Sequence, residues 1–217
     1  MLQRIDECAR RALDLSEQFL LMGRAESVDP ASFSEVDLVQ ILHQSADDLW
    51  EDARGQGVRI ERRCDMDCAL VQGDARLLHR ALLNLGWNGI RHGLHHGTVT
   101  LSLQATPAAY VLAVHDQGAG FALDALAHLS QRYTQAVQSA PTSQASVALT
   151  ASGADTAAAK AATAAAGKGA GQSKGQGAGH GLGLALARLV AAKHHATLTA
   201  EHPPGGGFCM AISLPRL

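Results

Sequence analysis

Two asparagines and one arginine are the first residues whose types and spacing could do chemistry. Asn84 and Asn88 are four residues apart in a segment with helical spacing, so both amides lie on one face of that helix. Mg²⁺ prefers oxygen ligands and in proteins often binds phosphate oxygens of a substrate as well. Neutral amide oxygens are therefore suitable protein ligands for it. Arg91 follows Asn88 by three residues and can offer a cation to a phosphate. Taken alone, such a pair of amides is more typical of a solvated helix face or a hydrogen-bonded core amide.

A carboxylate followed by two glycines forms the second group. Asp116, Gly118 and Gly120 come directly after a run with strand alternation. A carboxylate at the end of a strand can accept a hydrogen bond from an exocyclic amine, and the glycines let the backbone approach a flat ligand. An isolated motif of this kind is more typical of a simple turn.

Three alternating glycines form the third group. Gly179, Gly181 and Gly183 open a predicted helix, where exposed N–H groups at the positive helix end favour an anion. No strand precedes them and no G-x-G-x-x-G is present, so this is not a dinucleotide-binding fingerprint. Lys174 is followed by glycine rather than by Ser or Thr, so the neighbouring segment is not a P-loop.

Periodicity along the chain predicts the elements that must hold these groups. Asp74 can cap a helix that contains both asparagines, and Pro107 separates two strands of which the second ends near Asp116. Other helices are expected over 1–24, 36–54, 123–132 and 182–195. Strands are expected over 58–62, 69–71, 98–104, 110–115, 197–201 and 208–214. These elements predict a compact α/β unit over 33–116, with structure resuming at Gly179.

The first 24 residues carry an apolar seam with alternating spacings of three and four. Its members are Ile5, Cys8, Ala12, Leu15, Phe19 and Met22. The seam predicts a helix that packs either on its own domain or, as we favour, in a dimeric helical bundle. Pro30 and the polar residues around it separate this helix from the α/β unit.

One long segment has a composition unlike the rest. Alanine and glycine make up nearly half of residues 134–178, which contain a single acid, Asp155, and no aromatic residue. Such a segment cannot bury enough apolar surface to offset its ordering entropy, so we expect a long mobile loop.

Charge and cysteine content exclude several classes of protein. The formal charge of −2 argues against a strongly positive surface of the kind that binds nucleic acids. No apolar run is long enough to cross a bilayer, and the first 20 residues do not resemble a signal peptide, so we expect no direct membrane contact. The four cysteines are scattered, which favours reduced cytoplasmic thiols. His92, His95 and His96 could bind a metal, but solvated loop residues are the simpler interpretation.

Taken in order, these groups resemble the ATP-binding domain of sensor histidine kinases, in the superfamily shared with gyrase and chaperone-type ATPases. Residues 84–93 resemble its N box, 116–120 its G1 box and 179–183 its G2 box. The entry to the N-box helix at 73–77 and the chain's ending from Gly206 onward are also similar. The resemblance implies an α+β fold, namely a two-layer sandwich of a mixed sheet with helices on one face, preceded by a helix of a dimerisation hairpin.

The resemblance also assigns roles to site residues. It implies that Asn88 coordinates Mg²⁺, that Asn84 assists near the phosphates, and that Arg91 is a basic phosphate contact. Asp116 would hold the adenine amine. The remaining positions fall into three groups: Gly118 and Gly120 would shape the adenine wall, Gly179, Gly181 and Gly183 would cradle phosphates, and Leu182 and Leu184 would anchor the helix.

The implied organisation has two parts. Residues 1–32 would be a partial dimerisation helix and linker, and residues 33–217 the ATP-binding catalytic domain. Residues 121–178 would form a long ATP lid in which Tyr133 stands in for the usual aromatic. No histidine followed by an acid is present in a helix before residue 33, so we expect a fragment whose acceptor histidine lies elsewhere.

Three functions are compatible with this resemblance. The first is a kinase module that binds ATP and Mg²⁺, phosphorylates a hairpin histidine in a homodimeric parent, and serves a response-regulator receiver domain in the cytoplasm. The second is a gyrase- or chaperone-type ATPase, but those enzymes need a Glu where Asn84 stands, so rapid hydrolysis is not expected. The third is a nucleotide-binding regulatory module without catalysis.

Two departures from the family concern local structure. Gly86 and Gly89 lie inside the N-box helix, where each costs about 1 kcal/mol relative to alanine, so a looser helix is expected. His194-His195-Ala196 stands where the family usually has His-Gly-Gly, which puts the local turn in doubt.

Overall fold

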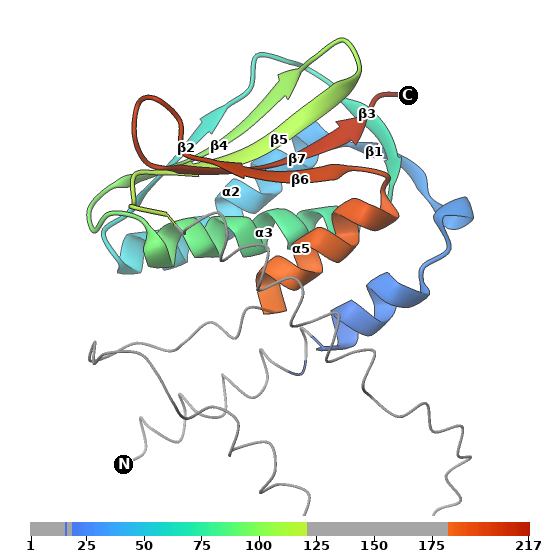
Figure 1. Ribbon diagram of the computed structural model, residues 1–217, viewed down its shortest axis with the longest axis horizontal. Helices are drawn as coiled ribbons and strands as arrows, with labels where there is room; N and C mark the ends of the chain where they lie inside the picture. The colour runs from blue at the N-terminus through green and yellow to red at the C-terminus, as the bar shows by residue number, and fades with distance from the viewer. Residues whose placement is uncertain (1–15, 17–18, 121–181) are drawn as a thin grey trace, which may run out of the picture.

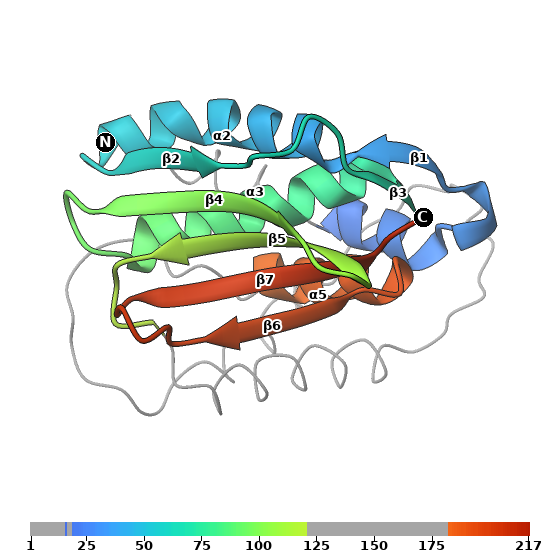
Figure 2. The same ribbon diagram turned by 90° about the horizontal axis from the view of Figure 1, so that it is seen from above.

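A five-stranded sheet with helices on one face makes up the main body of the chain, as Figures 1 and 2 show. It is seen in a computed structural model that describes residues 16, 19–120 and 182–217. The helices are α2 (Leu38–Gly55), α3 (Ala75–His92) and α5 (Leu182–Lys193), with a 3-10 turn η1 (Pro30–Ser32). The strands are β1 (Ser34–Asp37), β2 (Arg59–Arg63), β3 (Leu70–Gly73), β4 (Thr98–Ala105), β5 (Ala109–Asp116), β6 (Thr197–Glu201) and β7 (Phe208–Pro215).

The main sheet is mixed. Its strand order is β2-β4-β5-β7-β6, in which β2 and β4 are parallel and the other neighbours antiparallel. A separate ribbon of β1 and β3 lies at one end of the helix layer (Figure 2). The predicted two-layer α+β sandwich, with a mixed sheet and helices on one face, is therefore confirmed.

Alternation along the central strands creates the core. Val99, Leu101 and Leu103 of β4 are buried, as are Leu112 and Val114 of β5, and all five belong to one core cluster with the buried helix residues. The apolar stripe of α3 packs against these strands, and the small aromatic content is compensated by leucine, valine and alanine. No helix in the described part of the chain is long and apolar enough to cross a membrane.

Helix α3 begins where the sequence predicted. Asp74 is its N-cap, and Oδ1 accepts hydrogen bonds from the N–H groups of Arg76 and Leu77 at 2.9 and 3.1 Å. Burial pushes the pKa of Asp74 upward, but these bonds and the Arg24 guanidinium outweigh it, so the pKa is lowered. A cap of this kind typically contributes about 1 kcal/mol.

The glycines inside α3 have a packing role. A Cβ at Gly86 would lie 2.3 Å from Cδ1 of Leu49 on α2, and one at Gly89 would lie 3.3 Å from the Val99 side chain. The glycines therefore let α3 approach both its neighbouring helix and the sheet closely. This contact offsets the propensity cost, and the helix runs without a break to His92.

Several predicted boundaries are wrong. Helix 36–54 starts instead at Leu38, because Ser34–Asp37 pairs with β3 as a strand and Asp37 caps the helix with a 3.0 Å bond from the Val39 N–H. The helix expected to end at residue 24 continues to Ser27. Helix 182–195 ends at Lys193. The expected helix 123–132, the lid and Tyr133 lie outside the described residues.

The N-terminal helical segment, residues 19–27, divides its apolar residues between two environments. Met22 is only 1% exposed and belongs to the core of its own domain, whereas Phe19 is 60% exposed. Met22 is therefore not available to the dimer seam in which the sequence pattern placed it. Lys193 fixes the end of this segment, because Nζ donates to the carbonyl oxygens of Glu26 and Val28 at 2.7 and 3.4 Å.

His194 locks the turn that the sequence left in doubt. Its Nδ1–H donates to the Val190 carbonyl at 2.7 Å, and Nε2 accepts from the Asp74 N–H at 2.9 Å. The ring stacks on Phe33 with centroids 4.4 Å apart. His195 then takes a left-handed φ of 51°. Burial lowers the pKa of His194, and the neutral ring is the form that satisfies both bonds.

This arrangement predicts acid sensitivity of the fold. An unfolded histidine has a pKa of about 6.5, and the folded value of His194 is lower, so the stabilisation is complete above about pH 6.5 and is lost as the pH falls. We expect the free energy of unfolding in urea to decline between about pH 7 and pH 5.

The variant His194→Gln should show a shallower decline, with a lower stability at neutral pH. His95→Gln, at an exposed position after α3, is the matched control and should follow the wild-type profile. Identical slopes for wild type and His194→Gln would contradict the prediction.

Candidate functional site

Asp116 is a buried carboxylate at the end of β5. It lies in register between Val99 of β4 and Phe208 of β7, so it is surrounded by sheet on both sides. Its Oδ1 accepts the Gly118 N–H at 2.7 Å. Burial raises the pKa of Asp116, and the bond from Gly118 opposes this rise. One carboxylate oxygen is thus oriented by the protein, and a ligand donor can use the other.

Two glycines make this burial sterically feasible. A Cβ at Gly118 would lie 2.4 Å from the His92 carbonyl oxygen and 2.8 Å from Oδ1 of Asp116. Gly207 has a φ of +86°, and a Cβ there would lie 2.1 Å from the Asp116 carbonyl oxygen. No side chain fits at either position without moving backbone.

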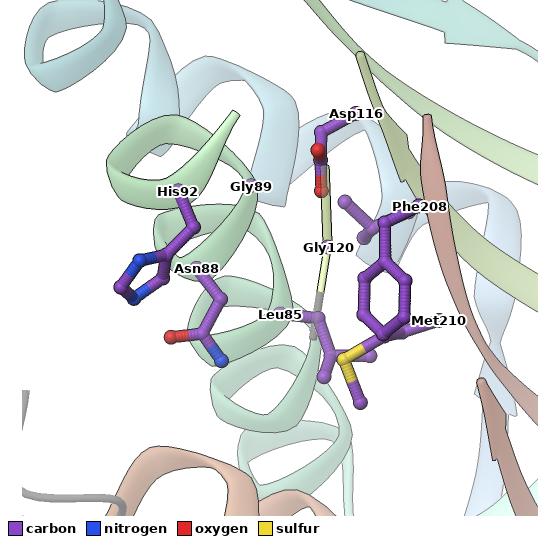
Figure 3. A pocket seen from close by; sticks show the side chains of 9 residues that line it. Leu85, Asn88, Gly89, His92, Asp116, Gly120, Phe208 and Met210 are labelled. Atoms are coloured by element: carbon purple, nitrogen blue, oxygen red, sulfur yellow. The ribbon is translucent and has the colours of Figure 1, made fainter. Parts of the chain in front are cut away.

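A pocket opens between α3 and the sheet beside Asp116 (Figure 3). On the helix side, Asn88 and His92 are one turn apart and both line the pocket. In Figure 3 their side chains extend from the near face of α3, with the His92 ring directed away from Asp116. Burial and the Arg91 charge lower the pKa of His92, while Asp116 opposes them. The full lining is Leu85, Asn88, Gly89, His92, Val114, Asp116, Gly120, Phe208 and Met210. The pocket therefore has apolar walls with a carboxylate and an amide facing into it.

Asn84 lies one turn before Asn88 and is only 3% exposed. Its Nδ2 has no hydrogen-bond partner among the described residues. A Cβ at Gly183, in the first turn of α5, would lie 3.3 Å from Cγ of Asn84. The start of α5 therefore packs directly on this amide, and a larger residue at 183 would press against it.

The structure brings only part of the predicted site together. Asn88, Asp116 and Gly120 line one pocket; Gly118 bonds to Asp116, and Asn84 lies one helical turn before Asn88. Arg91 is exposed and is not among the lining residues. Leu182 and Leu184 are partly buried against the core, and Gly183 contacts Asn84. Gly179 and Gly181 lie outside the described residues.

The donors present are suited to Mg²⁺ together with phosphate. The Asn88 amide has no hydrogen-bond partner among residues 19–120 and 182–217, so its oxygen is available to a cation. Within the same residues no cluster of three His, Cys, Asp or Glu side chains could hold a metal, and the exposed His95 and His96 do not join His92 in one. A cation here would depend on Asn88 and on ligand oxygens.

Six of the lining residues were not predicted as site residues, among them His92, Phe208 and Met210. His92 follows Asn88 by four residues. That spacing places both residues on one helix face and could have indicated His92 as a pocket residue. Phe208 and Met210 alternate on the inward face of β7 and are indistinguishable in sequence from ordinary core residues. His115, next to Asp116 in the chain, interacts with the Gly206 carbonyl at 3.0 Å through Nε2.

Comparison with known protein families identifies this arrangement. The profile described as histidine kinase-, DNA gyrase B-, and HSP90-like ATPase matches residues 73–217, which is more than half of the chain. The chain belongs to this family. The fold described above is thus that of an ATP-binding domain of the kind found in sensor histidine kinases.

Individual relatives agree with this assignment. The chain is 26% identical over 202 residues to the sensor protein CutS of Streptomyces coelicolor, and the alignment covers 93% of this chain and 40% of that protein. The chain therefore spans about 40% of the length of the curated relatives it matches. Its fold is similar to that of the mycobacterial sensor histidine kinase MprB (TM-score 0.58, 21% identity, covering 85% of this chain and 97% of that one). It is also similar to full-length ShkA in complex with AMPPNP (TM-score 0.67, 20% identity, covering 97% and 37%).

The steric environment of Asp116 predicts that alanine substitutions in the turn formed by Gly205, Gly206 and Gly207 differ sharply in their effect on stability. Gly207→Ala should lower the free energy of unfolding by about 1–3 kcal/mol, because a left-handed φ and a backbone clash coincide there. Gly205→Ala, two residues earlier with open space around its Cβ position, should stay within about 0.5 kcal/mol of wild type. Urea denaturation of both variants checks this, and equal losses would contradict it.

Proposed function

We propose that this chain is the ATP- and Mg²⁺-binding kinase module of a two-component sensor histidine kinase. The observation that carries the proposal is the pairing of a buried, oriented carboxylate, Asp116, with the available amide of Asn88 across one pocket. The family membership of residues 73–217 supports ATP as the ligand of this pocket.

The adenine end of the ligand is assigned to Asp116. Gly118 occupies one carboxylate oxygen, so the other accepts the exocyclic amine of the base. The base itself is held by the apolar walls of the pocket, which exclude water from this hydrogen bond and thereby strengthen it. A carboxylate that is already held in place loses little side-chain entropy when the base binds.

The phosphate end of the ligand is assigned to helix α3, which carries Asn84 and Asn88, and to the start of α5. The Asn88 amide oxygen would hold Mg²⁺, and Asn84 and the start of α5 lie beside it. When bound, the cation neutralises charge on the phosphate oxygens. Arg91, Gly179, Gly181, Leu182 and Leu184 keep the roles that the family resemblance implies, as phosphate contacts and helix anchors.

The transfer step requires positioning rather than covalent chemistry by this domain. The γ-phosphoryl group passes to a histidine on the dimerisation hairpin, with ADP as the leaving group, and onward to an aspartate of a response-regulator receiver domain. We place residues 1–32 in the partial dimerisation helix and linker of a homodimeric parent, and residues 33–217 in the catalytic domain.

A second candidate is a nucleotide-binding module with slow or no chemistry. Asn84 stands where the hydrolytic members of the superfamily carry a glutamate, and its buried amide cannot accept a proton from water. This argues against a fast ATPase and leaves phosphotransfer or regulation as the outcomes to be separated by experiment.

Nucleotide binding should depend on both ends of the pocket. Asp116→Asn keeps an acceptor for Gly118 but turns the other oxygen into a donor that opposes the amine, so ATP affinity should fall at least about tenfold. Asn88→Ala should remove most of the Mg²⁺ dependence of binding. Isothermal titration with and without Mg²⁺ measures both effects.

Asp67→Asn provides the control, since this carboxylate is exposed and makes no ion pair within the described residues. Binding that survives both Asp116→Asn and Asn88→Ala would refute the site.

The chemistry can be tested without knowing the natural partner. The chain alone, with ATP and Mg²⁺, should turn over slowly, because Asn84 stands in place of a carboxylate that could activate water. A hairpin carrying an acceptor histidine should become labelled by γ-³²P-ATP in the presence of the chain. Rapid release of phosphate without a partner would favour the ATPase instead.

A further inference from the structure

We propose that Trp87 positions Asn88 by tying the C-terminal half of α3 to Asp52 on α2. This inference rests on the proposed function, in which the Asn88 amide oxygen holds Mg²⁺. Trp87 directly precedes Asn88 in the chain but is not one of the described residues that line the pocket. Its role is therefore that of a positioning residue, which acts on the ligand through its neighbour.

The turn of α3 that carries Asn88 has little helical stability of its own. Gly86 and Gly89 enclose Trp87 and Asn88, and glycine is among the least favourable residues inside a helix. A cation ligand must nevertheless present its oxygen at a defined place, which requires a backbone that is held still. Tertiary contacts of this turn have to supply what the glycines do not.

A hydrogen bond between the two helices meets this need. The indole Nε1–H of Trp87 donates to Oδ2 of Asp52, in the last turns of α2, at 2.8 Å. Because the acceptor is a carboxylate, this bond belongs to the stronger, charge-assisted kind. A planar peptide bond joins residue 87 to Asn88, so a displacement of the backbone at Trp87 is passed directly to Asn88.

Arg80 supports the same ring from a second direction. Its guanidinium carbon lies 4.8 Å from the centre of the Trp87 ring, and it is about two helical turns earlier on α3. Arg80 Nε is buried and has no hydrogen-bond partner among the described residues. Since Arg80 and Trp87 share one helix, their contact orients the ring, whereas the Asp52 bond attaches α3 to α2.

The second tryptophan of the chain provides a comparison. Trp50 on α2 is 52% exposed, and the guanidinium carbon of Arg54 lies 5.2 Å from its ring centre. Both partners of that contact belong to α2, so it does not join two helices. A tryptophan beside an arginine is thus present twice, and only at Trp87 does it act together with a bond to the neighbouring helix.

The test measures ATP binding to the full chain by titration calorimetry, with Mg²⁺ and with EDTA. Asp52→Ala removes the acceptor and Trp87→Phe removes the donor. Each should weaken ATP binding about tenfold in Mg²⁺ but less than about twofold in EDTA, because the Asp116 end of the pocket is unchanged. The double variant should lose no more than either single variant, since all three lack the same bond.

Two control variants accompany these changes. Asp52→Asn keeps an acceptor oxygen for the indole and should restore most of the Mg²⁺ effect that Asp52→Ala loses. Trp50→Phe should bind ATP like wild type under both conditions. If Trp87→Phe does not fold, Asp52→Ala decides the question alone, because Asp52 is exposed and its removal leaves no cavity in the core.

Hydrogen exchange of the ligand-free chain gives a readout that needs neither ATP nor Mg²⁺. In Asp52→Ala, the backbone amides of residues 88–92 should exchange at least about threefold faster than in wild type, because the turn opens locally more often. The amides of residues 42–48, in the middle of α2, should keep their wild-type rates. Unchanged exchange at 88–92 would overturn the inference.

The outcomes also separate this inference from the proposed function. Equal losses in Mg²⁺ and in EDTA would show that the bond serves general stability, and the role of Trp87 would be wrong. If Asn88→Ala removes the Mg²⁺ effect while Asp52→Ala and Trp87→Phe retain it, the cation site stands and this inference falls. If wild type binds ATP no better with Mg²⁺, or does not bind it, both proposals fail together.

Discussion

The burial of one carboxylate is the constraint on which the rest of the pocket depends. Asp116 ends the central strand β5, and its charge must be compensated within a site whose lining is mostly apolar. The compensation comes from backbone, through the Gly118 N–H, and backbone can approach only where side chains are absent. Gly118 and Gly207 come from segments far apart in the chain, yet both are required by this single group. The remaining acceptor capacity of the carboxylate is what makes it available to a ligand.

Helix α3 provides the opposite wall and fixes its distance from the carboxylate. The Asp74 cap defines where the helix starts, and its 18 residues carry Asn84 and Asn88 to the level of the β5 end. Gly89 lets the helix approach within van der Waals contact of the Asp116 Cβ, at 3.5 Å from its own Cβ position. An alanine there would gain helix propensity but press on the sheet beside the carboxylate. The glycine therefore favours the site at the expense of local helix stability.

How far the sequence predicts this molecule differs between its elements. Helix α3 and the pocket positions of Asn88 and Asp116 were predictable, because a cap, a helical stripe and a strand-end motif are local signals. Strand β1 was not, since Ser34–Asp37 is too short to show alternation and its partner β3 is distant in the chain. Phe208 looked like any inward strand residue, and only the register with Asp116 places it in the pocket. Met22 fitted a coiled-coil seam, but the tertiary fold buries it in the core.

Helix α5 links two contacts that the sequence presents as unrelated. Its first turn packs on Asn84 through Gly183, and the residues at its other end, Lys193 and His194, hold the N-terminal helical segment and the cap of α3. Its 12 helical residues span about 18 Å and resist bending. Because its middle is buried in the core, α5 cannot shift at one end without straining contacts at the other. The geometry around Asn84 is therefore set partly by residues that never touch it.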